Sequence, residues 1–535
     1  MVLWNYGDIL DGISTVVPPE APAYIHGDRV INWGDATTRS NRLARAILAR
    51  GAEPGDKVAF YMHNRPEYCE TLAACFKARQ VHVNVNYRYT PDEVFYIFDN
   101  SDAKTVVYGR EFRDNINAIR DRLTKVTTFI EVGEGCDFAE SFEAICTTGD
   151  GSPLDIQRSP DDMMFIYTGG TTGMPKGVMW TQNDLRQITI LSAQALGPVP
   201  LTMEELLAAT RAAGPPPPSV IAPPLMHGTG LLTAIGAMLA GGAVITLPSL
   251  HFSAEEMLDT IDRWKPGSLT IVGDPFARPI AEALEREPGR WDVSTVARVT
   301  SSGVMWSLEV KRTLLKHMPQ AILGDAFSSS EALGLGTSLM TAAGEIQTAK
   351  FALGERARVF DENDQPVLPG SGVKGVVAVG PPGPVGYYKD PEKTARTFRM
   401  INGVRYSIPG DWCLVEPDGS LTLLGRGSAC INTAGEKVFP EEVEEALKTH
   451  PSVADALVVG LPDPKWGQSV TGVVHLHPGH TLDEGALVHH VRQHLAPYKS
   501  PKRIVTGEVN LRAPNGKADY KSATDFAKAV LGHPA

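Results

Sequence analysis

The chain has 535 residues, of which 43% are hydrophobic and 21% are charged, a composition typical of soluble globular proteins. Its length exceeds that of one ordinary hydrophobic core, so we expect two or more domains. The balance of 50 basic and 62 acidic side chains gives a net charge of −12. This balance argues against a nucleic-acid partner, which would need a basic surface.

The cysteines and the amino terminus predict a cytoplasmic protein. No CxxC spacing occurs, so we expect reduced thiols and neither a zinc site nor a disulfide framework. The amino terminus has no basic stretch before an apolar core, so we expect no secretory signal. The six cysteines are Cys69, Cys75, Cys136, Cys146, Cys413 and Cys430.

The first hundred residues alternate between helical and strand patterns. This alternation favours a mainly parallel sheet that is covered by helices. In chain order we expect a helix, a hairpin around His26–Asp28 and a longer helix before Arg50, then a strand at 57–61, a helix at 67–77, a strand at 81–85 and a helix from Pro91.

Residues Met163–Trp180 have the composition of a strand followed by an anion-binding loop. An apolar run (Met163–Tyr167) leads into glycines and threonines and then Lys176. Glycine lets backbone amides approach an anion closely, while hydroxyls and an ammonium add donors, so the loop is suited to a polyphosphate. It is not the GxxxxGK[ST] loop, and an ordinary surface turn is the alternative. The loop residues are Thr168, Gly169, Gly170, Thr171, Thr172 and Gly173.

The uncharged stretch Gly228–Leu250 is long enough to span a membrane. Gly241 and Gly242 interrupt it, so a buried helix near Leu231–Ala240 and a strand at Ala243–Leu247 fit better. We therefore expect no transmembrane segment.

The remaining elements complete a large domain and a small one. Residues 184–219 predict an inserted loop that ends in the extended prolines 215–218. The last hundred residues suffice for a small α+β domain. The other predicted elements are strands at 268–272, 296–301 and 372–379, a turn and helix start at 386–394, a helix at 441–449, strands at 454–459 and 469–475, a helix at 483–495, and a terminal strand and loop.

The full string TGGTTGMPKG resembles the phosphate loop of adenylate-forming enzymes, the superfamily of acyl-CoA synthetases, luciferases and peptide-synthetase adenylation domains. Further family-like motifs follow in the same order as in the family: HGTG at 227–230, FSSSE at 327–331, GD at 410–411, GR at 425–426 and PNGK at 514–517. This order argues against a structural α/β protein with coincidental loops. The resemblance implies an α/β large N-terminal domain (1–425), a hinge (426–428) and a mobile small α+β C-terminal domain (429–535).

The resemblance also implies the residues that bind the nucleotide. The loop and Lys176 would hold the phosphates, Phe327 would stack on adenine, and Glu331 would hold Mg²⁺, which prefers one or two carboxylates together with phosphate oxygens. Ser328, Ser329 and Ser330 stand where the family has Gly-x-Thr, and Ser330 would bond a phosphate oxygen.

Three further residues complete the nucleotide site by resemblance. Asp411 would accept hydrogen bonds from the ribose hydroxyls, in a loop that follows YSIP. Arg426 would contact ribose or the α-phosphate. Lys517 would be the catalytic lysine, although a lone lysine in a loop is ordinarily a solvated charge.

The acyl and coenzyme A sites are also implied by resemblance. His227 would position the carboxylate beside the α-phosphate without transferring a proton, and Gly228 would leave room beside it. Gly303 and Val304 would line the acyl and adenine pocket. A lone histidine is otherwise a packing residue.

The hinge region would serve the second half of the reaction. Ser428 stands where the family often has Asp or Lys as the pivot, and the loop from Gly435 to Lys437 would guide coenzyme A.

We therefore predict a ligase that converts a carboxylic acid, ATP and coenzyme A into acyl-CoA, AMP and pyrophosphate through an acyl-adenylate. Blocks such as GDPFARP and DALVVGLPDP resemble acyl-CoA synthetases that activate steroid side-chain carboxylates, so a steroid or long-chain fatty acid is expected. An aryl-acid ligase and a non-catalytic nucleotide-binding relative are the alternatives. A homodimer is one oligomeric state that the sequence leaves open.

Overall fold

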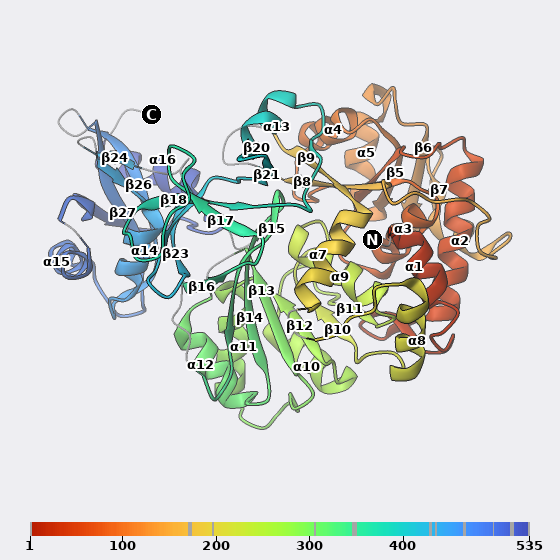
Figure 1. Ribbon diagram of the computed structural model, residues 1–535, viewed down its shortest axis with the longest axis horizontal. Coiled ribbons are helices and arrows are strands. Elements are labelled where there is room, and N and C mark those ends of the chain that lie inside the picture. Colours follow the sequence, from red (N-terminus) through yellow and green to blue (C-terminus); the bar gives the residue numbers. More distant parts are fainter. Residues whose placement is uncertain are drawn as a thin grey trace. The chain divides into compact units, whose positions relative to one another are not determined.

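The computed structural model describes most of the chain, and the described residues form two compact units. The large unit comprises Met1–Thr348 with Val379–Ser407, and the small unit comprises Ala349–Ala378 with Ile408–Ala535 (Figure 1). The described residues are 3–168, 174–194, 197–303, 306–344, 350–426, 431–433, 436–463, 467–495, 497–513 and 518–532.

The first sheet of the large unit has the strand order β2-β1-β11-β10-β12-β13-β14-β15. Its pairs from β1 through β14 are parallel, and β2 and β15 pair antiparallel with β1 and β14. The bounds are β1 (Pro22–His26), β2 (Arg29–Asn32), β10 (Ser219–Ile221), β11 (Val244–Thr246), β12 (Ser268–Ile271), β13 (Arg298–Ser302), β14 (Ile322–Ser329) and β15 (Ala332–Met340).

The second sheet of the large unit has the order β19-β9-β8-β4-β3-β5-β6-β7. Its pairs from β8 to β7 are parallel, and β9 and β19 add antiparallel strands at one edge. The bounds are β3 (Lys57–Tyr61), β4 (Val81–Asn84), β5 (Ala103–Gly109), β6 (Thr128–Val132), β7 (Glu140–Ser141), β8 (Met163–Thr168), β9 (Lys176–Thr181) and β19 (Gly386–Tyr387). The large unit also contains a hairpin of β20 (Phe398–Ile401) and β21 (Val404–Ser407), in which Ser407 also pairs with Val379.

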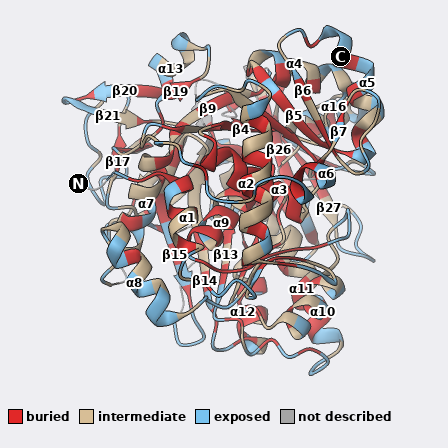
Figure 2. Cartoon of the chain, turned by 90° about the vertical axis from the view of Figure 1, so that its right-hand side faces the viewer, coloured by how far each residue is buried: buried red, intermediate tan, exposed pale blue. Residues whose placement is uncertain are grey.

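Helices pack on the faces of both sheets. Buried side chains of α1–α3 and α9 join strands of both sheets in one core, α10–α12 cover the first sheet, and α4 and α5 cover the second. The strands of both sheets are mainly buried, whereas α8 presents an exposed surface (Figure 2). The bounds are α1 (Tyr6–Ile13), α2 (Trp33–Ala49), α3 (Pro66–Lys77), α4 (Pro91–Asn100), α5 (Arg113–Ile119), α6 (Phe142–Thr147), α7 (Gln182–Gln194), α8 (Met203–Ala213), α9 (Gly228–Leu239), α10 (Ala254–Trp264), α11 (Asp274–Arg286), α12 (Leu308–His317) and α13 (Pro391–Thr397).

The small unit contains an antiparallel sheet and a mixed sheet. The antiparallel sheet has the order β16-β23-β22-β18, with β17 on β18, and the mixed sheet has the order β25-β24-β27-β26, with β28 on β27. Helices α14 and α15 pack on one face of the mixed sheet and α16 packs on the other. The bounds are β16 (Lys350–Leu353), β17 (Ala357–Phe360), β18 (Lys374–Val379), β22 (Asp411–Val415), β23 (Ser420–Arg426), β24 (Ile431–Thr433), β25 (Glu436–Val438), β26 (Val453–Asp463), β27 (Gly467–Leu476), β28 (Arg503–Thr506), α14 (Pro440–Lys448), α15 (Glu484–His494) and α16 (Tyr520–Leu531).

Most predicted elements are confirmed, but the loop predicted at 184–219 is wrong. The segment forms α7 and α8, and the described residues between the two helices and after α8 are irregular. The side chain of Thr202 accepts a hydrogen bond from the Glu205 amide while the Glu205 side chain bonds back to the Thr202 amide, which is a capping box that starts α8. The prolines at 215–218 favour an extended loop, whereas Thr202 and Glu205, thirteen and ten residues earlier, are the sequence signal for the helix.

The terminal loop predicted after the last strand is also wrong. The chain forms α16, which Asp519 caps by accepting from the Ser522 amide. Ala523 and Ala527 of this helix are fully buried against the mixed sheet. Because the buried residues of α16 are alanines, the helical pattern of apolar residues in this segment is weak. None of the helices in the described part of the chain is both long and apolar enough to cross a bilayer.

Candidate active site

Strands β8 and β9 hold the two ends of the predicted phosphate loop. Thr168 pairs directly with Lys176, and Tyr167 pairs with Gly177. A Cβ on Gly177 would lie 2.7 Å from the Tyr167 ring, so only glycine fits there. The loop residues Gly169, Gly170, Thr171, Thr172 and Gly173 lie outside the described residues, as do Val304, Ser428, Gly435 and Lys517.

Asn84 links the strand that enters the loop with the segment before His227. This buried amide sits at the end of β4, accepts a hydrogen bond from the Tyr167 amide at 2.6 Å, and donates to the carbonyls of Tyr167 at 2.8 Å and Met226 at 2.7 Å. All three bonds join backbone that water does not reach, and each such group would be costly if unpaired. The sequence did not single out Asn84.

His227 is the residue that precedes helix α9. Its own amide donates to the Pro224 carbonyl at 3.0 Å, and its carbonyl accepts from the Leu231 amide at 2.9 Å. A Cβ on Gly230 would lie 2.5 Å from the Pro224 carbonyl, whereas one on Gly228 would meet open space. Gly230 therefore allows the turn, whereas the role predicted for Gly228 beside His227 stays a prediction.

The predicted FSSSE motif lies on a β-hairpin, at the turn between β14 and β15. The three serines therefore lie at the end of a strand and in a turn, not at the start of a helix. Buried Trp180 of β9 donates from its indole Nε1 to the Ser330 carbonyl at 2.9 Å. The strand that begins at Lys176 therefore also holds the turn that precedes Glu331.

The side chains of this hairpin have distinct environments. Phe327 pairs across the hairpin with Gly336, which has no side chain. The Ser328 hydroxyl accepts from the Gly334 amide at 3.1 Å. The Ser329 hydroxyl is buried and has no hydrogen-bond partner within the described part of the chain.

Glu331 is held at both its backbone and its side chain. The Tyr387 hydroxyl donates to Glu331 Oε1 at 2.8 Å, and the Ser407 hydroxyl donates to the Glu331 carbonyl at 2.6 Å. Among the described residues no side chain donates to the second carboxylate oxygen, and no cluster of three His, Cys, Asp or Glu side chains forms a metal site. One free carboxylate oxygen fits Mg²⁺ that is otherwise bound by phosphate and water oxygens.

Lys176 forms an ion pair with Asp390. The Lys176 Nζ contacts Asp390 Oδ2, and Asp390 Oδ1 accepts from the Lys393 amide at 2.9 Å at the start of α13. The hydrogen bond from Lys176 lowers the pKa of Asp390, so this carboxylate stays ionised.

Asp411 and Arg426 are direct neighbours in the small unit. Asp411 was predicted in a loop, but it begins β22, where it pairs with Arg426 of β23. The adjacent Gly425 has φ +104°, and a Cβ there would overlap the Glu441 carboxylate at the start of α14. The spacing of these two predicted ribose contacts therefore reflects a hairpin.

The loop that carries Lys517 is tied together at its ends. Arg512 forms a β-bridge with Ala518, and the Asp519 amide donates to the Leu511 carbonyl at 2.9 Å. The Arg512 guanidinium also donates to Asp455 Oδ1 at 2.6 Å and Oδ2 at 2.8 Å, which lowers the pKa of Asp455 against the opposing effect of burial.

Helix α14 carries a buried carboxyl. Glu444 accepts from the Val458 amide at 2.9 Å, and burial raises its pKa to about 7. The carboxyl and the Tyr520 hydroxyl form a hydrogen bond, and the pKa of Tyr520 is raised mainly by burial.

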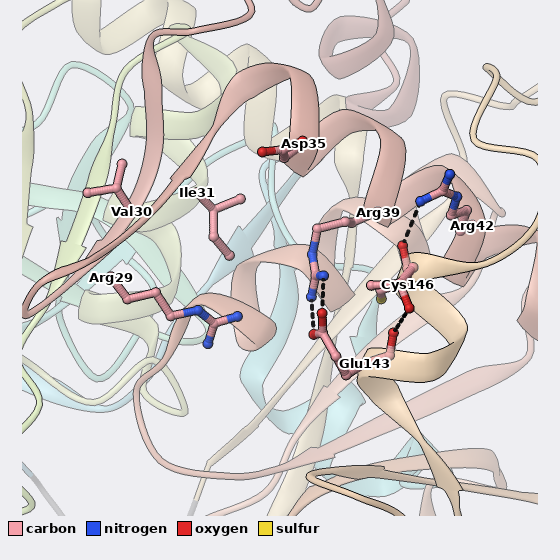
Figure 3. A pocket seen from close by; sticks show the side chains of 9 residues that line it. Arg29, Val30, Ile31, Asp35, Arg39, Arg42, Glu143 and Cys146 are labelled. Atoms are coloured by element: carbon pink, nitrogen blue, oxygen red, sulfur yellow. Dashed lines mark hydrogen bonds and ion pairs between the residues drawn. The ribbon is translucent and has the colours of Figure 1, made fainter.

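A polar pocket of about 360 Å³ in the large unit contains none of the predicted site residues (Figure 3). Its Arg39 pairs with Glu143 and with the buried Glu70, and Arg42 donates to the Cys146 carbonyl. Arg39 therefore has two carboxylate partners within the protein.

Family comparisons agree with this geometry. A model described as AMP-binding enzyme matches residues 14–388, and one described as AMP-binding enzyme C-terminal domain matches residues 442–517. The chain belongs to the AMP-binding enzyme family. This result and the fold confirm the predicted adenylate-forming architecture, although the boundaries at 425 and 429 stay predictions.

Relatives extend over nearly the whole chain. A medium/long-chain-fatty-acid–CoA/3-oxocholest-4-en-26-oate–CoA ligase of Mycobacterium marinum is 37% identical over 99% of this chain and 97% of its own length. A 3-oxocholest-4-en-26-oate–CoA ligase of Rhodococcus rhodochrous is 39% identical over 97% of this chain and 95% of its own. The solved structure of ATP-bound MatB from Rhodopseudomonas palustris shares the fold with a TM-score of 0.81 and 24% identity, covering 98% of this chain and 100% of that chain.

Proposed function

We propose that the protein is an ATP-dependent acyl-CoA synthetase that joins a carboxylic acid to coenzyme A. The observation that carries the proposal is the double role of strand β9. It begins with Lys176 at the end of the phosphate loop, and its Trp180 holds the turn before Glu331. One strand thus carries a cation suited to phosphates and holds the turn that precedes a carboxylate suited to a metal. An enzyme that binds MgATP needs both kinds of group.

In the first step, a carboxylate oxygen attacks the α-phosphorus of ATP and pyrophosphate leaves. The reaction gathers negative charge, so the protein contributes position and positive charge. In this proposal Lys176, the loop 168–173 and Lys517 hold the phosphates, and His227 orients the acid. Mg²⁺ held by Glu331 would neutralise phosphate charge.

The remaining nucleotide contacts follow the same scheme. Phe327 stacks on adenine, while the hydroxyls of Ser328, Ser329 and Ser330 line the nucleotide. Asp411 accepts from the ribose hydroxyls, and Arg426 contacts ribose or the α-phosphate.

In the second step, the thiol of coenzyme A attacks the acyl carbonyl and AMP leaves. We propose that the C-terminal domain turns at Ser428 between the steps, so that Lys517 withdraws and the loop from Gly435 to Lys437 guides coenzyme A. Such a rotation lets one site perform two reactions.

For the acid, we propose a bulky or long-chain carboxylate, either a fatty acid or a steroid side-chain acid. The support is the identity of 37% to 39% with ligases named for those acids. Gly228, Gly303 and Val304 would line the acyl pocket. An aryl acid is the second candidate. We also propose that the enzyme acts in the cytoplasm, and its mass in solution would decide between a monomer and a homodimer.

The test is ATP–pyrophosphate exchange across fatty acids, steroid side-chain acids and cinnamates, followed by acyl-CoA formation. We expect exchange and thioester formation with long-chain or steroid acids. Exchange with cinnamates alone would favour the aryl-acid alternative. Nucleotide binding without exchange for any acid would contradict the synthetase assignment.

A further inference from the structure

The segment Gly386–Thr397 runs beside the strand that leaves the phosphate loop. Its first residues pair with β9, Gly386 with Met179 and Tyr387 with Val178, and the segment continues into α13. Two of its side chains reach predicted nucleotide-binding groups: Tyr387 contacts Glu331, and Asp390 contacts Lys176.

Contacts other than the bond to Glu331 hold the Tyr387 side chain in place. Only 4% of the residue is exposed, its amide donates to the Thr394 hydroxyl at 2.9 Å, and its ring packs on Phe398 with centroids 5.6 Å apart. The hydroxyl therefore has a set position from which it donates to Glu331 Oε1. This bond orients the carboxylate and directs its other oxygen away from the phenol.

Asp390 is equally constrained. One oxygen accepts from the Lys393 amide, the other contacts Lys176, and its carbonyl accepts from the Thr394 hydroxyl at 2.7 Å. Lysine has three donors on a flexible stem. Lys176 can thus keep Asp390 and still donate to a phosphate, and the ion pair reduces the number of conformations that the stem would lose on binding.

We propose that Tyr387 and Asp390 are positioning residues for MgATP: Tyr387 presents the Glu331 carboxylate to the metal, and Asp390 holds the Lys176 ammonium where the phosphates bind. The inference rests on the proposed function, because it assigns those partners to Glu331 and Lys176. In this proposal the short segment Gly386–Thr397 orients both the Glu331 carboxylate and the Lys176 ammonium.

Tyr387→Phe tests the first half of the proposal. We expect the free Mg²⁺ concentration that gives half-maximal ATP binding to rise about tenfold, because a hydrogen bond to a charged group is lost. Calorimetric binding of ATP without any acid, repeated over a range of Mg²⁺, measures it. Tyr388→Phe is the matched control, because that phenol donates at 2.7 Å to Asp102 instead.

A double mutant separates positioning from simple packing. In a Glu331→Gln background, Tyr387→Phe should have no further effect on the Mg²⁺ requirement. An unchanged Mg²⁺ requirement in the single variant, or an equal shift in both backgrounds, would overturn the role of Tyr387. The hydroxyl can be deleted without changing the ring, and circular dichroism checks the fold.

Asp390→Asn tests the second half, because asparagine keeps the helix cap but removes the charge. If Asp390 positions Lys176, ATP at saturating Mg²⁺ should bind about fivefold more weakly. If Asp390 instead competes with phosphates for Lys176, binding would tighten, and this result or no change would overturn the proposal. Asp102→Asn is the control, because Asp102 pairs with Lys389 and Lys125.

The outcomes also distinguish this inference from the proposed function. If the wild-type protein binds MgATP but exchanges no pyrophosphate with any acid, the synthetase proposal fails. The binding shifts of the Tyr387 and Asp390 variants would still decide the positioning roles, because they are measured without an acid.

Discussion

The large and the small unit hold their candidate residues in different ways. In the large unit, partners come from remote parts of the chain: Trp180 and Ser330 are 150 residues apart, and Lys176 and Asp390 are 214 apart. In the small unit, the ends of the Lys517 loop bond to each other, and the link from the Arg512 side chain beside that loop to Asp455 spans 57 residues.

This difference suggests a division of labour. Contacts between remote residues can form only when the large unit is folded, so they order Glu331 and Lys176 in advance of binding. In the small unit, the described ends of the loop that contains Lys517 are joined by the Arg512–Ala518 bridge and the bond from the Asp519 amide to Leu511. Such a loop suits the role proposed for Lys517, which must serve one step and be absent from the other.

The largest expected effect comes from the tip of that loop. Lys517→Ala should slow adenylate formation on the order of a thousandfold, because a positive charge on the reacting phosphate is lost. It should spare thioester formation from supplied adenylate. Single-turnover assays of each half-reaction measure this, with the exposed Lys521→Ala as the control. Equal loss in both halves would contradict the division of labour.

Asn84→Ala tests the rigid scaffold of the large unit. Three buried backbone groups would lose their partner, so we expect a loss of about 4 kcal/mol in the free energy of unfolding. Urea denaturation measures it, together with weaker ATP binding. Asn115→Ala removes a single partly buried bond to Tyr61 and should cost about 1 kcal/mol. Equal losses of unfolding free energy in the two variants would contradict the proposal that Asn84 stabilises the large unit through three buried bonds.

Glu444→Gln tests the buried carboxyl of α14, which bonds to the Val458 amide and to Tyr520. The pKa of Glu444 is raised from 4.5 to about 7, so the folded protein keeps a proton that the unfolded chain has released in this window. Stability therefore falls as pH rises from about 5 to 8, by up to about 3 kcal/mol. The variant lacks this penalty.

Urea denaturation at pH 5 and pH 8 checks the Glu444 prediction. The stability of Glu444→Gln relative to the wild type should increase between the two values. Glu445→Gln, at the neighbouring half-exposed position, should follow the wild type. A parallel pH dependence of wild type and Glu444→Gln would assign the effect to other groups.

The smallest expected effect is that of Arg512→Lys. Lysine cannot keep both bonds to Asp455, and because this pair is partly exposed the loss should be about 1 kcal/mol. Looser loop ends should slow adenylate formation a few-fold and leave the thioester step unchanged. Arg503→Lys, at a more exposed pair with Glu484, should change neither rate. A slower thioester step in Arg512→Lys would contradict the proposal that the Lys517 loop serves adenylate formation alone.

The sequence by itself determined the family and most of the elements. The phosphate-loop string, FSSSE and the GR pair are local patterns, and apolar periodicity placed strands such as β3, β8 and β12 because each side of a strand or helix meets either core or water. The capping box of α8 was equally local but was outweighed by the proline run that follows it.

Only the tertiary structure decided what holds the candidate residues. Nothing near Glu331 in the chain indicates Tyr387, and nothing near Tyr167 indicates Asn84. Asn84 reaches Tyr167 from the neighbouring strand β4, and Tyr387 reaches Glu331 from the other sheet of the large unit. Side-chain hydrogen bonds depend on distances of about 3 Å and on direction. Those distances are fixed only when the sheets and their cores have formed, and a local pattern of residues does not contain them.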